Sequence, residues 1–412
     1  MANRRRNRRR PPKPHNGAAR APEGRQDDPP EAASSAEPPA LPGPPADTRP
    51  IARSRQSLPQ ERFAALDLGT NNCRLLIASP RGRGFRVFDA FSRIVRLGEG
   101  MSASGALSEA AMDRTIDALQ ICAEKIARRS VTRQRCIATQ ACRAASNGAA
   151  FLARVRDETG LDFEIITPAE EARLSVTGCA ELLDAEAKAG LIFDIGGGST
   201  EISWVRPGEK TETRGGARRA VDVAAWTSMP IGVVSLSEKF GGHELSREGY
   251  DEVVSFVREA LAQFGDPAGL QELFAAGDGH YLGTSGTVTS IAGVHLGLKR
   301  YRRDAVDGLW LNDIEVREVT ERLRAMSYDE RADEPCIGVE RADLVVCGCA
   351  ILDALLYEWP ATRIRVADRG LREGILVGLA GDQNRARGKK RGRRRGQRTD
   401  RPGAGAKPAE IA

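Results

Sequence analysis

The sequence of 412 residues lacks the features that mark several common protein classes. It has no run of about 18 apolar residues, so no transmembrane helix is predicted. Its arginine-rich N-terminus lacks the apolar segment of a secretory signal, and the prolines and acidic residues that follow argue against a transit peptide. None of the eight cysteines has the C-x-x-C spacing of a zinc site, which favours reduced, buried thiols in a cytoplasmic protein.

Charge is distributed unevenly along the chain. Residues 1–13 carry six Arg and one Lys, and residues 385–401 carry ten Lys or Arg and one Asp. Subtracting these contributions of +7 and +9 from the net charge of +6 leaves about −10 for residues 14–384. An acidic body does not attract a polyanion through its overall field. A polyanionic substrate would therefore need local amide dipoles, selected arginines and a divalent cation.

The two ends of the chain have the composition of disordered tails. Residues 1–60 are rich in Pro, Ala and Arg, and residues 381–412 are rich in Arg, Lys and Gly. Their arginines could contact RNA, DNA or polyphosphate through counterion release. No aromatic residues alternate with the arginines, so stacking on bases is not indicated, and solvated tails are an equally good interpretation.

Two similar stretches organise the region between the tails. In residues 191–203 an apolar run ends in Asp194, three glycines follow, and an apolar alternation resumes. Residues 63–77 repeat this order around Asp67 and Gly69. Each stretch predicts a strand, a tight turn and a second strand. Glycines in such a turn let backbone N–H groups approach an anion closely. A glycine-rich hairpin that binds no ligand would have the same sequence pattern.

The repetition favours a duplicated α/β fold with a ligand held between the copies. We predict one lobe over residues 61–185 and a second over residues 186–380, with the last helix able to pack on the first lobe. In the second lobe, the small residues of Leu282–Thr287 predict a turn at a helix N-terminus, which is a ready anion site. The apolar run Leu273–Ala276 is interpreted as a short strand.

Helix starts in the first lobe are also predicted. Ser108 can cap one helix, and Thr167 can cap another that has Pro168 at its first position. Glu170 and Glu171 in the first turn of the second helix complement its dipole, which is a purely structural role for them.

An ordered set of motifs resembles one known family. The motifs are Leu66–Asn71, Phe193–Glu201, Pro230–Val234, Gly283–Thr287 and Asp368–Gly374. Over residues 62–380 they closely resemble the exopolyphosphatase/guanosine pentaphosphate phosphohydrolase (Ppx/GppA) family of the actin-like ATPase superfamily. The resemblance implies two ribonuclease-H-like lobes hinged around a cleft, and a homodimer. It also implies Mg²⁺-assisted hydrolysis of a terminal phosphoanhydride in inorganic polyphosphate or in the guanosine 5′-triphosphate 3′-diphosphate alarmone.

The resemblance also suggests roles for individual residues. Asp194 and Glu201 are the candidate Mg²⁺ ligands. Arg93 and Arg143 are candidate phosphate contacts, but surface or interlobe ion pairs would explain them equally well. The full set of candidate phosphate-binding residues is Asp67, Gly69, Thr70, Asn71, Arg93, Arg143, Gly196, Gly197, Gly198, Ser199, Thr200, Gly283, Thr284, Ser285 and Gly286.

One position departs from the family pattern. The family segment often reads T-E-A-x-R, and its glutamate acts as the catalytic base, but here Thr139–Arg143 has Gln140 at that position. An amide can orient a water molecule but cannot take its proton. Other carboxylates could serve instead, namely Asp162, Glu170, Glu171 or Glu201. Weak activity, or a regulator that binds its ligand without cleaving it, are the alternatives. A kinase on the same superfamily fold is disfavoured by Asp368–Gly374.

Overall fold

The computed structural model describes residues 61–82, 84–213, 216–243, 245–266 and 269–381. These residues all belong to one compact unit that begins at Ser57. The predictions for the two tails lie outside the described residues. None of the described helices combines the length and the apolar composition that a membrane-spanning helix needs.

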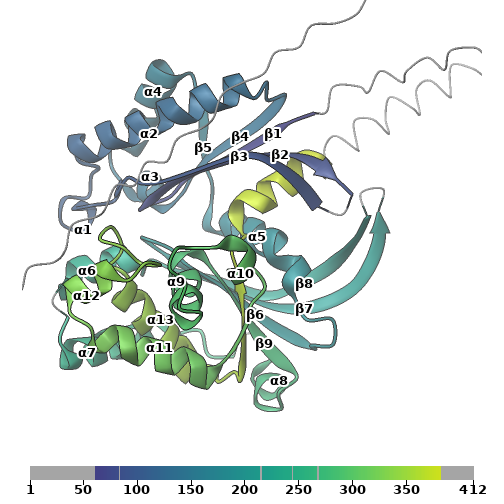
Figure 1. Ribbon diagram of the computed structural model, residues 1–412, viewed down its shortest axis with the longest axis vertical. Coiled ribbons are helices and arrows are strands. Elements are labelled where there is room, and N and C mark those ends of the chain that lie inside the picture. The colour runs from purple at the N-terminus through teal and green to yellow at the C-terminus, as the bar shows by residue number, and fades with distance from the viewer. Residues whose placement is uncertain (1–60, 83, 214–215, 244, 267–268, 382–412) are drawn as a thin grey trace, which may run out of the picture. The chain divides into compact units, whose positions relative to one another are not determined.

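Two β-sheets form the framework (Figure 1). The first contains β1 (Phe63–Leu68), β2 (Asn72–Arg81), β3 (Gly84–Ile94), β4 (Arg133–Ala138) and β5 (Phe163–Ile165). The second contains β6 (Ala189–Ile195), β7 (Thr200–Thr213), β8 (Gly216–Met229), β9 (Gly279–Thr284), β10 (Trp310–Asn312) and β11 (Arg363–Ala367).

The two sheets have the same internal order. The strands lie in the order β3-β2-β1-β4-β5 in one sheet and β10-β11-β9-β6-β7-β8 in the other. In each, a central strand pairs antiparallel with the strand that follows it and parallel with a later one. These sets are β1 with β2 and β4, and β6 with β7 and β9. The second sheet adds β10 as an antiparallel edge. The predicted duplicated α/β fold is confirmed.

Helices cover both sheets and supply the cores. The helices that follow strands of the first sheet are α1 (Met101–Ser104), α2 (Glu109–Arg128), α3 (Gln140–Ala144), α4 (Gly148–Thr159) and α5 (Pro168–Cys179). Those that follow strands of the second sheet are α6 (Val233–Phe240), α7 (Arg247–Ala262), α8 (Gln271–Ala275), α9 (Ser285–His295), α10 (Arg303–Val306), α11 (Asp313–Ala325), α12 (Tyr328–Asp333) and α13 (Val345–Glu358). Residues 371–381 form a final helix.

Both predicted caps are present, and one predicted strand is wrong. The Ser108 hydroxyl accepts a hydrogen bond from the Ala111 N–H, and the Thr167 hydroxyl accepts one from the Glu170 N–H. Residues 273–276, predicted as a strand, instead belong to α8 and the residue after it, because the short apolar run turns Phe274 into the core as part of a helix.

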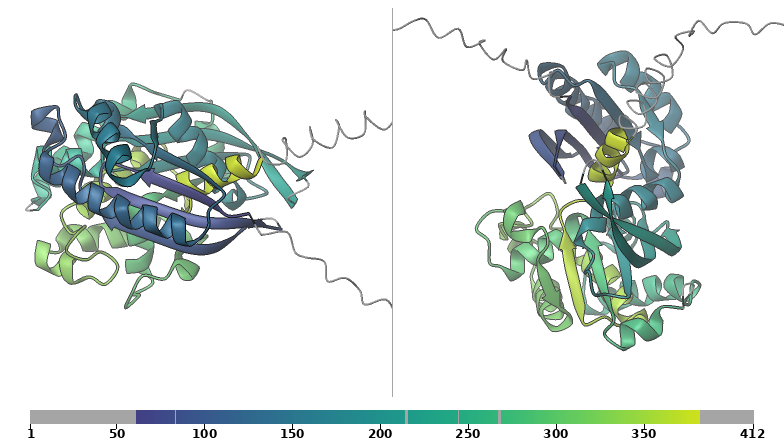
Figure 2. Two further views of the ribbon diagram at one scale, coloured as in Figure 1. Left: turned by 90° about the horizontal axis from the view of Figure 1, so that it is seen from above. Right: turned by 90° about the vertical axis from the view of Figure 1, so that its right-hand side faces the viewer.

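Helix α5 and the final helix lie between the two sheets, where Figure 2 shows them from two further sides. Glycines permit their close approach. A Cβ on Gly178 would lie 1.9 Å from the Gly370 carbonyl oxygen, and a Cβ on Gly374 would lie 2.1 Å from the Leu174 carbonyl oxygen. The final helix packs on the first sheet, since Ile375 joins its apolar cluster. These two segments therefore connect the sheets through backbone contact.

Two glycines of the final helix provide a matched test of this contact. Gly374→Ala is expected to lower the free energy of unfolding by about 1–3 kcal/mol or more, because its methyl group meets backbone that cannot move alone. Gly378 is exposed with no atom within 4 Å of its Cβ position, so Gly378→Ala is expected to raise stability by up to about 1 kcal/mol. Urea unfolding of both variants measures the difference. Equal effects of the two substitutions would contradict the proposed contact.

Candidate active site

A cavity of about 600 Å³ lies where the two sheets face each other, and both Asp-Gly turns contribute to it. Its lining includes most of the residues selected from sequence. These are Asp67, Gly69, Thr70, Asn71, Gln140, Glu171, Asp194, Gly196, Gly197, Gly198, Ser199, Glu201, Thr284, Ser285 and Gly286. A second cavity, of about 430 Å³, is lined by β3, α5 and β8 and contains none of the predicted site residues.

The loop after β3 also contacts the turn that precedes α13. Arg96, whose backbone φ is 47°, donates to both carboxylate oxygens of Asp343 at 2.9 and 3.1 Å. The loop is tied to the first turn, because the N–H groups of Val95 and Arg96 both donate to the Asn71 carbonyl. The ion pair between these two loops is thus made by Arg96 and not by Arg93 or Arg143.

The turn between β6 and β7 offers a set of backbone donors. It closes through a 2.9 Å hydrogen bond from the Gly196 N–H to the Ser199 carbonyl. The carbonyls of Gly196 and Gly197 accept from the first two amides of α6, at 3.0 and 2.8 Å. These bonds fix the two carbonyl groups. Among the described residues, the N–H groups of Gly197 and Gly198 have no backbone hydrogen-bond partner. Such amides form an anion-binding nest.

A second set of donors comes from the N-terminus of α9. Ser285 has a left-handed φ of 78°, and its hydroxyl donates to the Ile195 carbonyl at 2.6 Å. This bond ties the start of α9 to the strand that carries Asp194. Because Ser285 and Gly286 line the cavity at the start of an 11-residue helix, their region adds the positive end of a helix dipole to the nest.

Four of the carboxyl groups that line the cavity come from β1, α5, β6 and β7, and each of them is buried or half-buried. They are Asp67, Glu171, Asp194 and Glu201. Burial raises the pKa of Asp67 to about 6, although the positive charge of Arg74 acts to lower it. Burial likewise raises the pKa of Asp194. Burial, with repulsion from Glu201, raises the pKa of Glu171 well above its ordinary value. The cluster therefore carries unfavourable negative charge that a cation would relieve.

The raised pKa of Asp67 predicts a pH effect on stability without ligand. Between its ordinary value of 3.8 and about 6, the folded state holds the proton that the unfolded state has lost. The free energy of unfolding therefore falls as pH rises through this window, by on the order of 3 kcal/mol from this group. Asp67→Asn is expected to remove the contribution of this group to the pH dependence of the free energy of unfolding. Urea unfolding at pH 4, 5, 6 and 7 measures the change. A pH profile identical to that of the wild type would contradict it.

Arg143 connects Gln140 with Glu171. Its guanidinium donates to Gln140 Oε1 at 2.9 Å, to Glu171 Oε2 at 3.2 Å and to the Ile166 carbonyl at 2.8 Å. Arg143 itself does not line the cavity. It supports the two side chains that do, so its position differs from that of the phosphate contact expected from sequence.

Three predicted residues lie outside the cavity. The Asp162 side chain is 83% exposed and lies 3.9 Å from Arg156. Glu170 accepts hydrogen bonds from Arg135 and Arg173, which lower its pKa. Arg93 is exposed, with its guanidinium 5.5 Å from the centre of the Phe91 ring. Of the alternative bases named for Gln140, the geometry therefore favours Glu171 and Glu201.

Two further predicted phosphate contacts are occupied by strand pairing. Gly283 is not in a turn but in β9, where it lies between Phe193 and Val366 of the neighbouring strands. Thr200 begins β7, is fully buried, and donates its hydroxyl to the Ile231 carbonyl at 2.7 Å. Neither residue lines the cavity.

Two arginines that line the cavity, Arg74 and Arg372, were not among the residues predicted from the sequence. Arg74 lines it and is the cross-strand partner of Asp67 in the β1–β2 hairpin, a pairing that the hairpin register could have indicated. Arg372 lines it too and acts on the charge of Asp67. Arg372 lies within the motif Asp368–Gly374, so this motif could have indicated that it belongs to the site.

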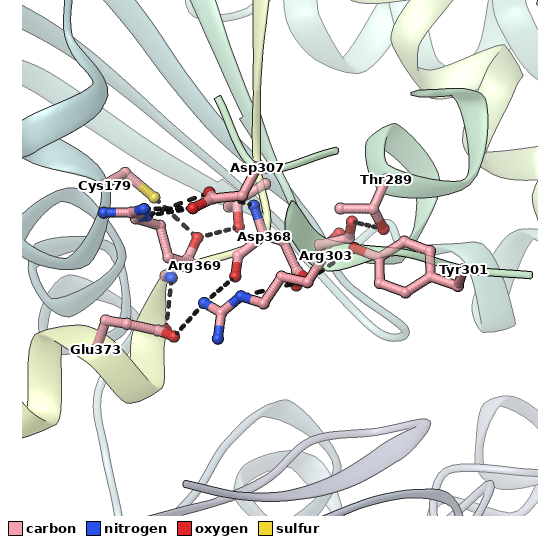
Figure 3. A network of polar contacts seen from close by, with 11 residues as sticks. Cys179, Thr289, Tyr301, Arg303, Asp307, Asp368, Arg369 and Glu373 are labelled. Atoms are coloured by element: carbon pink, nitrogen blue, oxygen red, sulfur yellow. Dashed lines mark hydrogen bonds and ion pairs between the residues drawn. The ribbon is translucent and has the colours of Figure 1, made fainter. Parts of the chain in front are cut away.

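A polar network fixes the segment that carries Arg372 (Figure 3). Arg369 pairs with both oxygens of Asp307, and Arg303 pairs with Glu373 at 2.9 Å. Glu373 in turn accepts from the Gly370 N–H at 3.0 Å. The turn from β11 into the final helix is therefore held on both sides, which sets the position from which Arg372 enters the cavity.

The donor set suits a hard cation that completes its shell with substrate and water. Among the described residues, no three His, Cys, Asp or Glu side chains converge on one point that could hold a metal ion. Asp194 and Glu201 line the cavity beside the nest and supply carboxylate oxygen. Mg²⁺ commonly binds one or two carboxylates together with substrate phosphates and water, so the residues present fit this ion.

Comparison with known proteins identifies similar sequences. The sequence model of the Ppx/GppA phosphatase family matches residues 76–383. Exopolyphosphatase 2 of Mycobacterium tuberculosis (strain H37Rv) is 31% identical over 335 residues, which cover 78% of this chain and 99% of that protein. A guanosine-5′-triphosphate,3′-diphosphate pyrophosphatase of Photobacterium profundum is 28% identical over 329 residues, covering 77% of this chain but 59% of that protein.

Solved structures give the same result for the fold. The crystal structure of the Aquifex aeolicus Ppx/GppA family member has a TM-score of 0.63 and 27% identity, covering 79% of this chain and 99% of that chain. An exopolyphosphatase from Cytophaga hutchinsonii has a TM-score of 0.67 at 24% identity, covering 77% of this chain and 97% of that chain, and supports the fold alone.

Proposed function

Because the chain belongs to the Ppx/GppA phosphatase family, we propose that it hydrolyses the terminal phosphoanhydride bond of inorganic polyphosphate, of guanosine pentaphosphate, or of both. The protein is a phosphohydrolase in which water forms a bond to the terminal phosphorus and the bridging P–O bond breaks. The products are inorganic phosphate and a chain shortened by one phosphate. Such transfer depends on positioning and charge neutralisation more than on covalent chemistry.

The observation that carries this proposal is the position of Glu171. Its carboxylate is buried, lines the cavity, and is bound to the same arginine as Gln140. It lines the same cavity as the nest at Gly197 and Gly198, so a water between them would have a proton acceptor on one side and phosphorus on the other. Glu171 accepts the proton of the attacking water, which the released phosphate then takes up. No observation favours binding without cleavage.

Mg²⁺ is part of this proposal, with Asp194 and Glu201 as its protein ligands. When bound, the ion neutralises charge on the phosphate oxygens. The turn amides of Gly197 and Gly198, together with the start of α9, hold the terminal phosphate. Arg74 and Arg372 extend the positive side of the cavity toward the next phosphates of the chain.

A phosphate-release assay tests the proposed function. The purified full chain is incubated with polyphosphate, guanosine pentaphosphate or ATP in the presence of Mg²⁺, and released phosphate is measured. We expect release from polyphosphate or guanosine pentaphosphate well above that from ATP. Tight binding of these ligands with no release from any of them would contradict hydrolysis and favour a binding protein.

The location of the chain, its oligomeric state and the ligands of its basic tail are also part of the proposal. We place it in the cytoplasm, in keeping with eight free, buried cysteines. A homodimer is proposed from the family relationship, and sedimentation equilibrium tests it. The basic residues 385–401 are proposed to contact polyphosphate or nucleic acid, so their removal should weaken binding of long polyphosphate more than binding of triphosphate, and most at low salt.

A further inference from the structure

Gln140 is placed to contact a phosphate held by the opposite sheet. It is the first residue of α3, and only Thr139 separates it from β4 of the first sheet. Its side chain reaches the glycine turn of the second sheet, because a Cβ on Gly198 would lie 2.9 Å from Gln140 Cγ and 2.7 Å from Thr70 Oγ1. Gln140 therefore lies against the nest, with only the absence of a side chain at Gly198 leaving room for it.

The orientation of the Gln140 amide follows from its partner. Arg143 donates from Nη2 to Gln140 at 2.9 Å. A guanidinium has donors and no acceptor, so the amide atom that faces it must be the oxygen. Arg143 is held in turn by the Ile166 carbonyl and by Glu171, which leaves it no freedom to turn away.

With its oxygen bound, Gln140 offers its NH₂ group to the cavity. Within the described part of the chain, Nε2 has no hydrogen-bond partner, and the residue lines the cavity. The glycine turn that Gln140 lies against carries the N–H groups of Gly197 and Gly198, which also lack backbone partners among the described residues. Donors from α3 and from the glycine turn thus border the same cavity, which is an arrangement suited to binding a phosphate oxygen.

We propose that Gln140 is a catalytic donor, whose Nε2–H bonds a non-bridging oxygen of the phosphoryl group being transferred, and that Arg143 is the positioning residue that fixes this orientation. This inference rests on the proposed function and assigns Gln140 a role opposite to that of a base. Gln140 takes no proton, and the proton of the attacking water goes to Glu171. A glutamate at position 140 would replace the donor by an acceptor and add a carboxylate to a cluster that already holds four.

Two substitutions at this position and one control test the proposal. Gln140→Met removes the donor and keeps the length, and Gln140→Glu keeps the shape and reverses the polarity. Both are expected to lower kcat by about 10²–10³-fold, the usual effect of removing one donor to a developing negative charge. Gln134→Glu makes the same chemical change at an exposed position of β4 and is expected to match the wild type. Thermal unfolding confirms that each variant is folded.

The direction of the Gln140→Glu effect decides between the roles. Turnover above that of the wild type would show that position 140 is a base site and would overturn the proposal, as would wild-type kcat in Gln140→Met. Calorimetric binding of inorganic tripolyphosphate supplies a readout without turnover, where both variants are expected to bind more weakly than Gln134→Glu. If the wild type releases no phosphate, the proposed function fails, and the calorimetric comparison alone supports or overturns the donor role.

Discussion

Replacing Glu171 with glutamine is expected to lower kcat for phosphate release by about 10²–10⁴-fold, the contribution of a positioned general base. The substitution keeps the shape of the side chain but removes its capacity to accept a proton from water. Arg143 can still donate to the new amide oxygen, so Gln140 should keep its orientation. The loss should therefore appear in kcat, with a smaller change in KM. Single-turnover phosphate release measures the chemical step directly.

The neighbouring glutamate provides the control for this prediction. Glu170 is in the same turn of α5 but is bound to Arg135 and Arg173 outside the cavity. Glu170→Gln should change kcat little, because surface ion pairs contribute about 0–1 kcal/mol to stability and do not touch the substrate. Equal losses in the two variants would mean that α5 and not the carboxylate is responsible. Wild-type turnover in Glu171→Gln would exclude Glu171 as the base.

The pH dependence of turnover provides a second test of Glu171 as the catalytic base. Burial, and repulsion from Glu201, raise the pKa of this carboxyl well above its ordinary value of 4.5. A base acts in its ionised form, so wild-type kcat should decline on the acid side at a pH above 4.5. Glu171→Gln should lack this decline. The same decline in wild type and variant would assign it to a different group.

The duplicated sheet could be predicted because its signal is local. In both copies an apolar strand, an aspartate and a glycine lie within a few consecutive positions, so no distant information is needed to recognise them. The same holds for Ser108 and Thr167, whose capping depends on the next three residues. Strand β9 was missed for the opposite reason. All six of its residues are buried between β6 and β11, so it lacks the alternation that marks a half-exposed strand.

The site residues that sequence could not assign depend on long-range packing. Glu170 and Glu171 are adjacent, and successive helix positions point about 100° apart, so only one can face the cavity. Which one does so depends on the rotation of α5, and the close approaches of Gly178 to Gly370 and of Leu174 to Gly374 restrict that rotation from far along the chain. Arg74 and Arg93 lie on neighbouring strands, and the sheet geometry brings only Arg74 to the cavity.

Asp194→Asn is expected to reduce turnover and to weaken the apparent affinity for Mg²⁺ by at least about 10–100-fold, the loss seen when even outer-shell partners of a metal are changed. Asparagine keeps the oxygen that accepts from Ser175 but loses the charge that a divalent cation needs. Phosphate release measured across Mg²⁺ concentrations gives the affinity. Asp222→Asn, at an exposed position of β8, is the control and should leave the Mg²⁺ dependence unchanged.

The same substitution should leave the protein without ligand as stable as the wild type or more stable. Burial raises the pKa of Asp194, so above that pKa the folded state carries a charge that the unfolded state solvates better. Removing the charge removes this penalty, and the melting temperature at pH 7 should stay level or rise. A variant with lower Mg²⁺ affinity and undiminished stability would mean that the carboxylate is kept for the ion and not for the fold. A clear loss of stability, with unaltered kinetics at every Mg²⁺ concentration, would instead make Asp194 a structural residue.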